Sequence, residues 1–224
     1  MAEIWLVRHG QASLGTDNYD QLSDLGHQQA RWLGQHLRAR AADRPVHLVS
    51  GQMARQIQTA DGIAESLPLA SRAQMDAFNE FDFESVVMSW LEQNPGYPLA
   101  PSPSAAELRR LLYSAMGAWA EGQLSLPAHK ECWPAFHQRV ASGWQQLAPA
   151  ADSVMMVVSS AGAIASVLRH VMRLDNAATL ELNLQICNAS LTRLVRTESG
   201  TALTAFNDVS YLESGDRAHA ITFA

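Results

Sequence analysis

The sequence predicts an α/β fold, a three-layer α/β/α arrangement with a mostly parallel central sheet between two layers of helices. Three short apolar runs, at residues 3–8, 46–50 and 153–159, are rich in β-branched residues, and each is followed by a helical pattern. Strands that alternate with helices favour a parallel sheet, because each helix carries the chain back across the sheet. With 224 residues and no internal repeat, residues 1–224 are expected to form one domain.

The first predicted strand, EIWLVR at 3–8, leads into a predicted helix over residues 23–40. Within that helix leucines and a glutamine recur at four-residue steps, so that one face can pack on a sheet. Ser23 or Asp24 is expected to cap its N-terminus, since short polar side chains accept hydrogen bonds from the first N–H groups of a helix.

The rest of the chain continues this alternation and ends in a β-hairpin. The two segments at 191–196 and 201–207, separated by Glu-Ser-Gly, are predicted to form that hairpin. Between them and the first helix, further helices are predicted at 53–66, 104–121, 132–147 and 162–172.

One segment departs from regular structure. Residues 93–104, QNPGYPLAPSPS, are rich in proline and cannot form a regular element throughout. No self-sufficient set of strands lies on either side, so we interpret the segment as an excursion over the functional edge of the sheet rather than as a domain linker.

Composition excludes several classes of protein. The formal net charge is −6, and no run of Lys or Arg suits a nucleic-acid backbone or an anionic membrane surface. The N-terminus lacks the basic start and apolar stretch of a signal peptide, and no window is long enough to span a membrane, so a cytoplasmic location is expected. His129, Cys132 and His137 offer only three candidate zinc ligands, so we expect no metal.

Polar residues follow the first two strands at the point where each strand ends. Arg8, His9 and Gly10 follow the first strand, and Arg55 lies one turn into the helix after the second. Taken singly, a histidine after a strand is more often structural, and an arginine on a helix is more often solvated.

Two further polar segments come later in the chain, one after the segment around Ala73–Met75 and one after the strand at 153–159. Glu80 lies among aromatic residues in NEFDFE, where a low local dielectric favours a protonated carboxyl group. Ser160, Ala161 and Gly162 follow the strand at 153–159, and such small residues leave the N–H groups of the next helix open to an anion or simply allow tight packing.

These four segments are expected to converge, because the carboxyl ends of parallel strands share one edge of a sheet. Together they supply two arginines, a histidine, a carboxylic acid and a helix N-terminus. That combination predicts a site for a dianionic phosphate group.

The same segments resemble the histidine phosphatase superfamily, in the branch that includes the cofactor-dependent phosphoglycerate mutases. The resemblance covers nearly the whole chain and is most specific in the first third. The matching segments are LVRHG at 6–10, LSDLGHQQA at 22–30, RQIQTA at 55–60, NEFDF at 79–83, NAS at 188–190 and FND at 206–208.

The resemblance implies a phosphomonoesterase that acts on a small organic phosphate through a phosphohistidine intermediate, with no cofactor and no metal. His9 would be the nucleophile, and Glu80 would be the proton donor and then the base. Arg8, Arg55 and Gly10 would bind the phosphate.

This chain departs from the family where Ser160 takes the place of the second active-site histidine. We expect the Ser160 hydroxyl, with the N–H groups of Ala161 and Gly162, to bind the phosphate instead. Two alternatives stay open: a mutase-like phosphotransfer, which the absence of Lys and Arg between Glu80 and Ser104 disfavours, and a catalytically impaired phosphate-binding protein. The physiological substrate and the oligomeric state stay undetermined.

Overall fold

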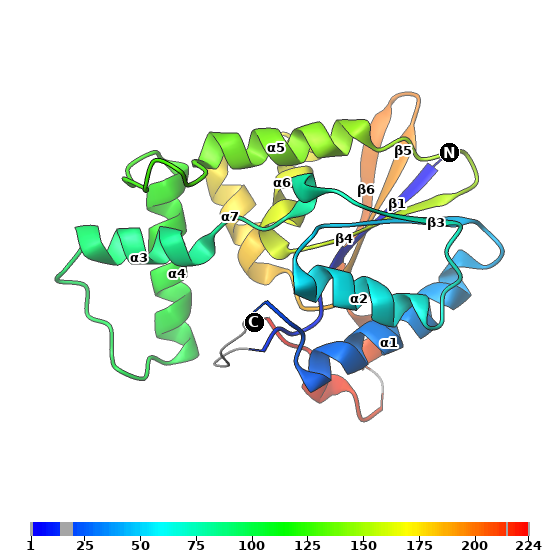
Figure 1. The fold of residues 1–224 in the computed structure, drawn as a ribbon, viewed down its shortest axis with the longest axis horizontal. Coiled ribbons are helices and arrows are strands. Elements are labelled where there is room, and N and C mark those ends of the chain that lie inside the picture. Colours follow the sequence, from blue (N-terminus) through cyan, green and yellow to red (C-terminus); the bar gives the residue numbers. More distant parts are fainter. Residues whose placement is uncertain (1, 14–19, 214, 224) are drawn as a thin grey trace.

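Among the residues that the structure describes, the central sheet has six strands in the order β3-β2-β4-β1-β5-β6. The structure, a computed structural model, describes residues 2–13, 20–213 and 215–223. Helices lie on both faces of the sheet (Figure 1), so the predicted three-layer arrangement is confirmed. The strands are β1 (Ala2–Arg8), β2 (Val46–Ser50), β3 (Ser71–Gln74), β4 (Val154–Ser159), β5 (Leu191–Thr197) and β6 (Gly200–Asp208).

The sheet is mostly parallel, as expected from the alternation of strands and helices. Strands β3, β2, β4 and β1 are parallel to one another. The last two strands form an antiparallel hairpin, and β5 pairs antiparallel with β1. The predicted C-terminal hairpin is therefore confirmed, and it extends the sheet beyond β1.

Strand β1 connects the two hydrophobic cores. Ile4 and Leu6 pack in one core, with residues of the helices above the sheet in Figure 1. Trp5 and Val7 point to the opposite face and pack in the second core. All four side chains are fully buried, so β1 is a central strand and its end is held rigidly.

The five helices predicted from the sequence are all present, within a few residues of the expected bounds. Ser23 caps α1 by accepting a hydrogen bond from the backbone N–H of Gly26, in agreement with the prediction. The helices are α1 (Asp24–Ala41), α2 (Ala54–Ala64), η1 (Asp76–Phe78), α3 (Phe83–Gln93), α4 (Ala105–Ala120), α5 (Trp133–Gln146), α6 (Ala161–Met172), α7 (Asn176–Gln185), α8 (Ser210–Glu213) and η2 (Ala218–Ala220).

Several elements lie outside the sequence prediction, among them the short helices η1, α8 and η2. The edge strand β3, with sequence SRAQ, is exposed along its whole length, so it carries no apolar alternation that would mark it as a strand. Helices α3 and α7 were also unexpected. Residues 94–104 connect α3 to α4 without a helix or strand, as the proline content predicted, and α3 and α4 stand apart from the sheet (Figure 1).

Among the described residues, no helix has both the length and the apolar character needed to cross a membrane. Nor does that part of the chain bring together three or more His, Cys, Asp or Glu side chains in a way that would hold a metal ion.

Candidate active site

The residues that follow β1, β2 and β4 are held side by side by backbone hydrogen bonds. The His9 N–H donates to the Ser159 carbonyl over 2.8 Å, and the Gly51 N–H donates to the Val158 carbonyl over 3.0 Å. These bonds continue the parallel pairing of the strands past their last residues. The expected convergence at one edge of the sheet is therefore present.

His9 is held as a neutral imidazole of defined tautomer. Its Nδ1 lies 2.7 Å from the Gly10 carbonyl oxygen, which can only accept, so Nδ1 carries the proton. Nε2 then has a lone pair, and it accepts a hydrogen bond from Nε of Arg55 over 3.1 Å. Burial, with Arg8 and Arg55 nearby, holds the pKa of His9 well below its ordinary value of 6.5. His9 as a whole residue is only 4% exposed.

Arg55 is oriented by an acid that the sequence analysis did not identify. Nη1 of Arg55 lies 2.8 Å from Oδ1 of Asp20, and Oδ2 of Asp20 accepts from the backbone N–H of Ala54 over 2.9 Å. The carboxylate thus joins the guanidinium to the N-terminus of α2, where a negative charge is favoured by the helix dipole. No sequence pattern marks Asp20 for this contact.

Arg8, the second predicted phosphate ligand, also lies beside His9. Its Nη1 donates to the carbonyl oxygens of Ile186, at the end of α7, and of Phe223, so backbone groups from two later segments orient this guanidinium. Nδ2 of Asn188 donates to the carbonyl oxygen of His9 over 3.3 Å, so the segment after α7 also contacts the residue that follows β1.

Gly10 allows the strand end to pack closely on α1. A Cβ atom at this position would lie 2.5 Å from the carbonyl oxygen of Gly26, which no side chain tolerates. The Gly10 N–H donates to Oγ1 of Thr59 over 3.0 Å, so in this structure it is engaged within the protein.

Glu80 follows η1 and reaches the N-terminus of α6. One carboxylate oxygen accepts from the Gly162 N–H over 3.0 Å and the other from the Phe81 N–H over 3.2 Å. Burial raises the pKa of Glu80, although these N–H groups and Arg55 oppose the shift. The net direction favours a carboxyl group that keeps its proton to higher pH than an exposed glutamic acid does.

The neighbouring acids have other contacts. Asp82 caps α3 by accepting from Ser85 and forms an ion pair with Lys130, and Glu84 is exposed in the first turn of that helix.

Ser160, Ala161 and Gly162 form the start of α6, as the sequence indicated, but their contacts differ from an open anion site. The Gly162 N–H is occupied by Glu80. The Ser160 hydroxyl accepts a hydrogen bond from Nε2 of Gln56 over 2.9 Å, a partner that the sequence analysis did not identify. All three residues at this turn are buried.

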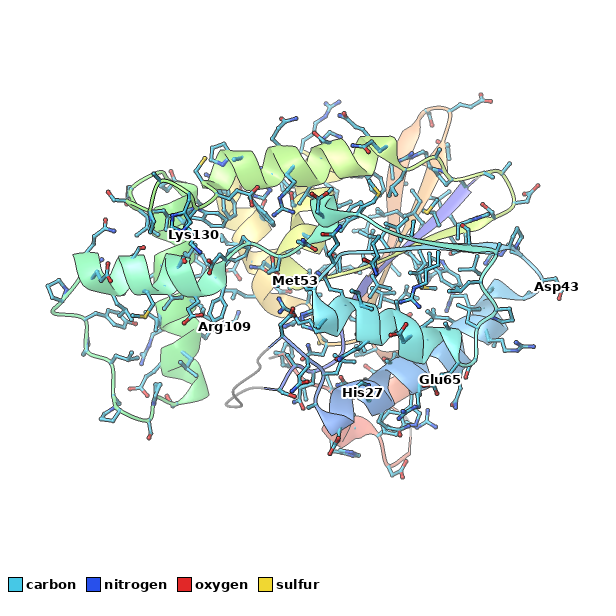
Figure 2. The ribbon with its side chains drawn as sticks, in the orientation of Figure 1. His27, Asp43, Met53, Glu65, Arg109 and Lys130 are labelled. Carbon is cyan, nitrogen blue, oxygen red and sulfur yellow. The ribbon has the colours of Figure 1, made fainter. Side chains whose placement is uncertain are left out.

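The site faces the part of the molecule formed by α3 and α4. Figure 2 shows Met53 at the end of α2 near the centre of the molecule, whereas Glu65 marks the other end of that helix and Asp43 lies farther away. Arg109 of α4 and Lys130 lie on the side of α3 and α4. The end of α2 that carries Arg55 is therefore the end directed toward these two helices.

Comparison with known proteins gives one family and several similar structures. Residues 4–209 match the family model of the histidine phosphatase superfamily, branch 1. No curated protein matches the sequence.

Similar solved structures share the fold over almost the whole chain. A phosphoserine phosphatase from Entamoeba histolytica in complex with 3-phosphoglyceric acid is 18% identical, with a TM-score of 0.65 over 95% of this chain and 100% of that one. A mycobacterial glucosyl-3-phosphoglycerate phosphatase in complex with inorganic phosphate is 22% identical, with a TM-score of 0.62 over 94% and 99% of the two chains. A protein described as mycobacterial hydrolase 1 is 23% identical, with a TM-score of 0.63 over 92% and 98%.

Proposed function

The chain belongs to the histidine phosphatase superfamily, branch 1, and from that premise we propose that it is a phosphomonoesterase acting through a phosphohistidine on His9. The observation that carries the proposal is the state of the His9 imidazole, which is neutral and has its Nε2 lone pair beside Arg55. A nucleophilic histidine needs that lone pair, and a phosphate dianion needs the adjacent cations.

In the first step, Nε2 of His9 attacks phosphorus. The Arg55 N–H that now bonds to Nε2 must first turn to a non-bridging oxygen of the phosphate, and Arg8 binds another such oxygen. The new N–P bond forms as the P–O bond to the leaving group breaks. Glu80 transfers its proton to the leaving alkoxide oxygen and becomes a carboxylate.

In the second step, the Glu80 carboxylate takes a proton from water. The water oxygen attacks phosphorus, and the bond to Nε2 breaks as inorganic phosphate is released. His9 returns to the neutral tautomer with its proton on Nδ1, which the Gly10 carbonyl holds throughout.

A small phosphate ester is the substrate class we propose. The similar structures include phosphatases of phosphoserine and of glucosyl-3-phosphoglycerate, which supports a small organic phosphate. A mutase holds a second anionic group over the site, and the chain has no Lys or Arg between Glu80 and Ser104.

One observation favours a different function, that of a phosphate-binding protein without turnover. Ser160 takes the place at which the family resemblance puts a second histidine, and removing one donor to a transferring group costs about 100- to 1,000-fold in rate. Such a loss would leave a slow enzyme, since the nucleophile and the proton donor are retained.

The experiment that tests the proposal combines turnover with detection of the intermediate. With p-nitrophenyl phosphate, the wild type is expected to release nitrophenol and to carry acid-labile phosphate on His9. His9→Ala is expected to lose both, because no other group in the site replaces the nucleophile. His170→Ala, at an exposed position in the last turn of α6, is the matched control and is expected to keep both.

A further inference from the structure

The side chain of Gln56 contacts Ser160, the residue that stands where the second histidine is expected. Gln56 follows Arg55 in α2 and is fully buried. The orientation of its side-chain amide is fixed by one backbone carbonyl and one backbone N–H group. Nε2 lies 3.1 Å from the Phe78 carbonyl, which can only accept, and Oε1 lies 3.3 Å from the Met53 N–H, which can only donate.

This orientation determines the polarity of the bond to Ser160. Since Nε2 faces Phe78, its second N–H donates to Oγ of Ser160 over 2.9 Å. An amide NH₂ group cannot accept, so the Ser160 hydroxyl cannot give its proton to Gln56. Its proton is left for another acceptor.

The Ser160 hydroxyl does not cap its own helix, although it occupies the N-cap position of α6. A serine at this position usually accepts from an N–H of the first turn. Here the Gly162 N–H is taken by the Glu80 carboxylate. The serine is therefore held by Gln56 rather than by the helix.

The residues that flank Ser160 contact the two reacting groups of the proposed mechanism. On one side, the carbonyl of its neighbour Ser159 accepts from the His9 N–H. On the other side, Gly162 bonds to Glu80. The backbone next to Ser160 is therefore bonded to the nucleophile on one side and to the proton donor on the other.

We infer that Gln56 positions Ser160 so that the Ser160 hydroxyl donates its proton to an oxygen of the transferring phosphoryl group. The inference rests on the proposed phosphatase function and assigns a new residue to it. Gln56 is a positioning residue, and Ser160 is the catalytic donor. The bond from Gln56 polarises the hydroxyl and makes it a stronger donor. Because both groups are uncharged, this donor keeps its proton over the whole working pH range.

The packing around Gln56 indicates that its side chain is held in one position against Ser160. A Cβ atom on Gly51 would lie 1.9 Å from Oε1 of Gln56, so the absence of a side chain at position 51 makes room for the amide. The turn after β2 is thus shaped around this glutamine.

The test is a double-mutant cycle of Ser160→Ala and Gln56→Met, in the full chain. Methionine keeps the length and volume of glutamine but cannot donate. Ser153→Ala is the matched control, since Ser153 is a buried serine at the other end of β4, bonded to the Ala150 carbonyl. The readouts are the single-turnover rate of His9 phosphorylation and the affinities for orthovanadate and inorganic phosphate, with thermal unfolding to check the fold.

Ser160→Ala is expected to slow phosphorylation by about 100-fold or more and to weaken vanadate binding much more than phosphate binding. Gln56→Met is also expected to slow phosphorylation. The double variant is expected to be no slower than Ser160→Ala alone, because Gln56 acts through Ser160. Ser153→Ala is expected to match the wild type.

Two results would overturn the inference while leaving the proposed function in place. One is a wild-type rate and wild-type vanadate affinity in folded Ser160→Ala. The other is a double variant whose loss equals the product of the two single losses, which would give Gln56 an independent, structural role. If the wild type forms no phosphohistidine, the proposed function is wrong. The donor role of Ser160 is then tested by vanadate binding alone, and a selective loss of vanadate affinity in Ser160→Ala would support it. A wild type that does not bind vanadate would overturn both.

Discussion

At the scale of single residues, the chemistry depends on which protons His9 and Glu80 hold. The His9 pKa is lowered by burial and by Arg8 and Arg55, whereas burial raises the Glu80 pKa. These two shifts favour the unprotonated form of His9 and the protonated form of Glu80 over the same pH range. His9 is then available as a base and Glu80 as an acid. This separation is what a histidine nucleophile and a general acid need at neutral pH.

Glu80→Gln should separate substrates by the quality of their leaving groups. The amide cannot supply a proton, so hydrolysis of an alkyl phosphate is expected to fall by about 100-fold or more, and that of p-nitrophenyl phosphate much less. Because the rate falls as pH rises through the pKa of a required acid, the alkaline decline of the alkyl phosphate profile is expected to disappear in the variant. Initial rates between pH 5 and 9 are the measurement.

The control for this variant is Glu84→Gln, an exposed acid in the next helix, which is expected to leave both substrates unaffected. Equal losses on both substrates in Glu80→Gln would contradict the general-acid role.

At the scale of elements, the junction of β4 with α6 brings Glu80 into the site. The Ser159 hydroxyl donates to the Phe78 carbonyl over 2.7 Å, and the Gly162 N–H donates to Glu80. A strand end and a helix start thus hold the segment that follows η1 at two points. The proton donor is positioned by contacts between elements rather than by its own turn.

Gly162→Ala is expected to disturb this junction. A Cβ atom at position 162 would lie 2.3 Å from Oε1 of Glu80 and 2.8 Å from the Phe81 ring, so the carboxylate must move. Alanine favours a helix by roughly 0.5–1 kcal/mol over glycine, whereas a steric clash of this kind costs about 1–3 kcal/mol. We expect a small net loss of stability and at least a tenfold loss of kcat on alkyl phosphates.

Gly117→Ala in α4 is the matched control, because a Cβ atom there meets nothing within 4 Å. It is expected to keep full activity and to raise the free energy of unfolding by roughly 0.5–1 kcal/mol. Full activity in Gly162→Ala would show that Glu80 does not need the observed position. Kinetic assays and urea unfolding of both variants decide the question.

At the scale of the whole molecule, the packing of α5 on α6 couples stability to pH. His137 of α5 packs against Trp133 with ring centroids 4.2 Å apart, and its Nδ1 lies 2.7 Å from Oγ of Ser166 in α6. Burial, with Arg169 of α6 nearby, lowers the pKa of His137 from 6.5 to about 4. Charging this ring would place a cation in the interface of the two helices.

The sign of the pH effect follows from that lowered pKa. Between pH 6.5 and about 4 the unfolded chain binds a proton at His137 that the folded chain does not, so the free energy of unfolding falls as pH is lowered through this range. His9 and His36, whose pKa values are also lowered in the fold, act in the same direction.

His137→Gln is expected to make stability less sensitive to pH between 7 and 4.5, with a residual slope from the other histidines. His170→Gln, at an exposed position on α6, is the control and is expected to keep the wild-type slope. Urea unfolding at a series of pH values measures both. An unchanged slope in His137→Gln would contradict the assignment.

The elements with local signals could be predicted from the amino-acid sequence alone. The strands β1, β2 and β4 are apolar runs, and the helices that follow them repeat apolar residues at helical spacing, so their burial can be read from neighbouring residues. The convergence of His9, Arg55, Glu80 and Ser160 was also predictable, because parallel strands place their carboxyl ends at one edge.

The contacts between side chains at that edge could not be predicted, because they depend on how the whole chain packs. Asp20 on Arg55, Gln56 on Ser160 and Glu80 on Gly162 are polar contacts between separate elements. Local periodicity reports which face of an element is buried, but a hydrogen bond between elements depends on distances of a few ångströms that the packing of the whole chain sets. Strand β3 was not predicted for the same reason. Its place at the edge of the sheet comes from its backbone pairing with β2 rather than from its side chains.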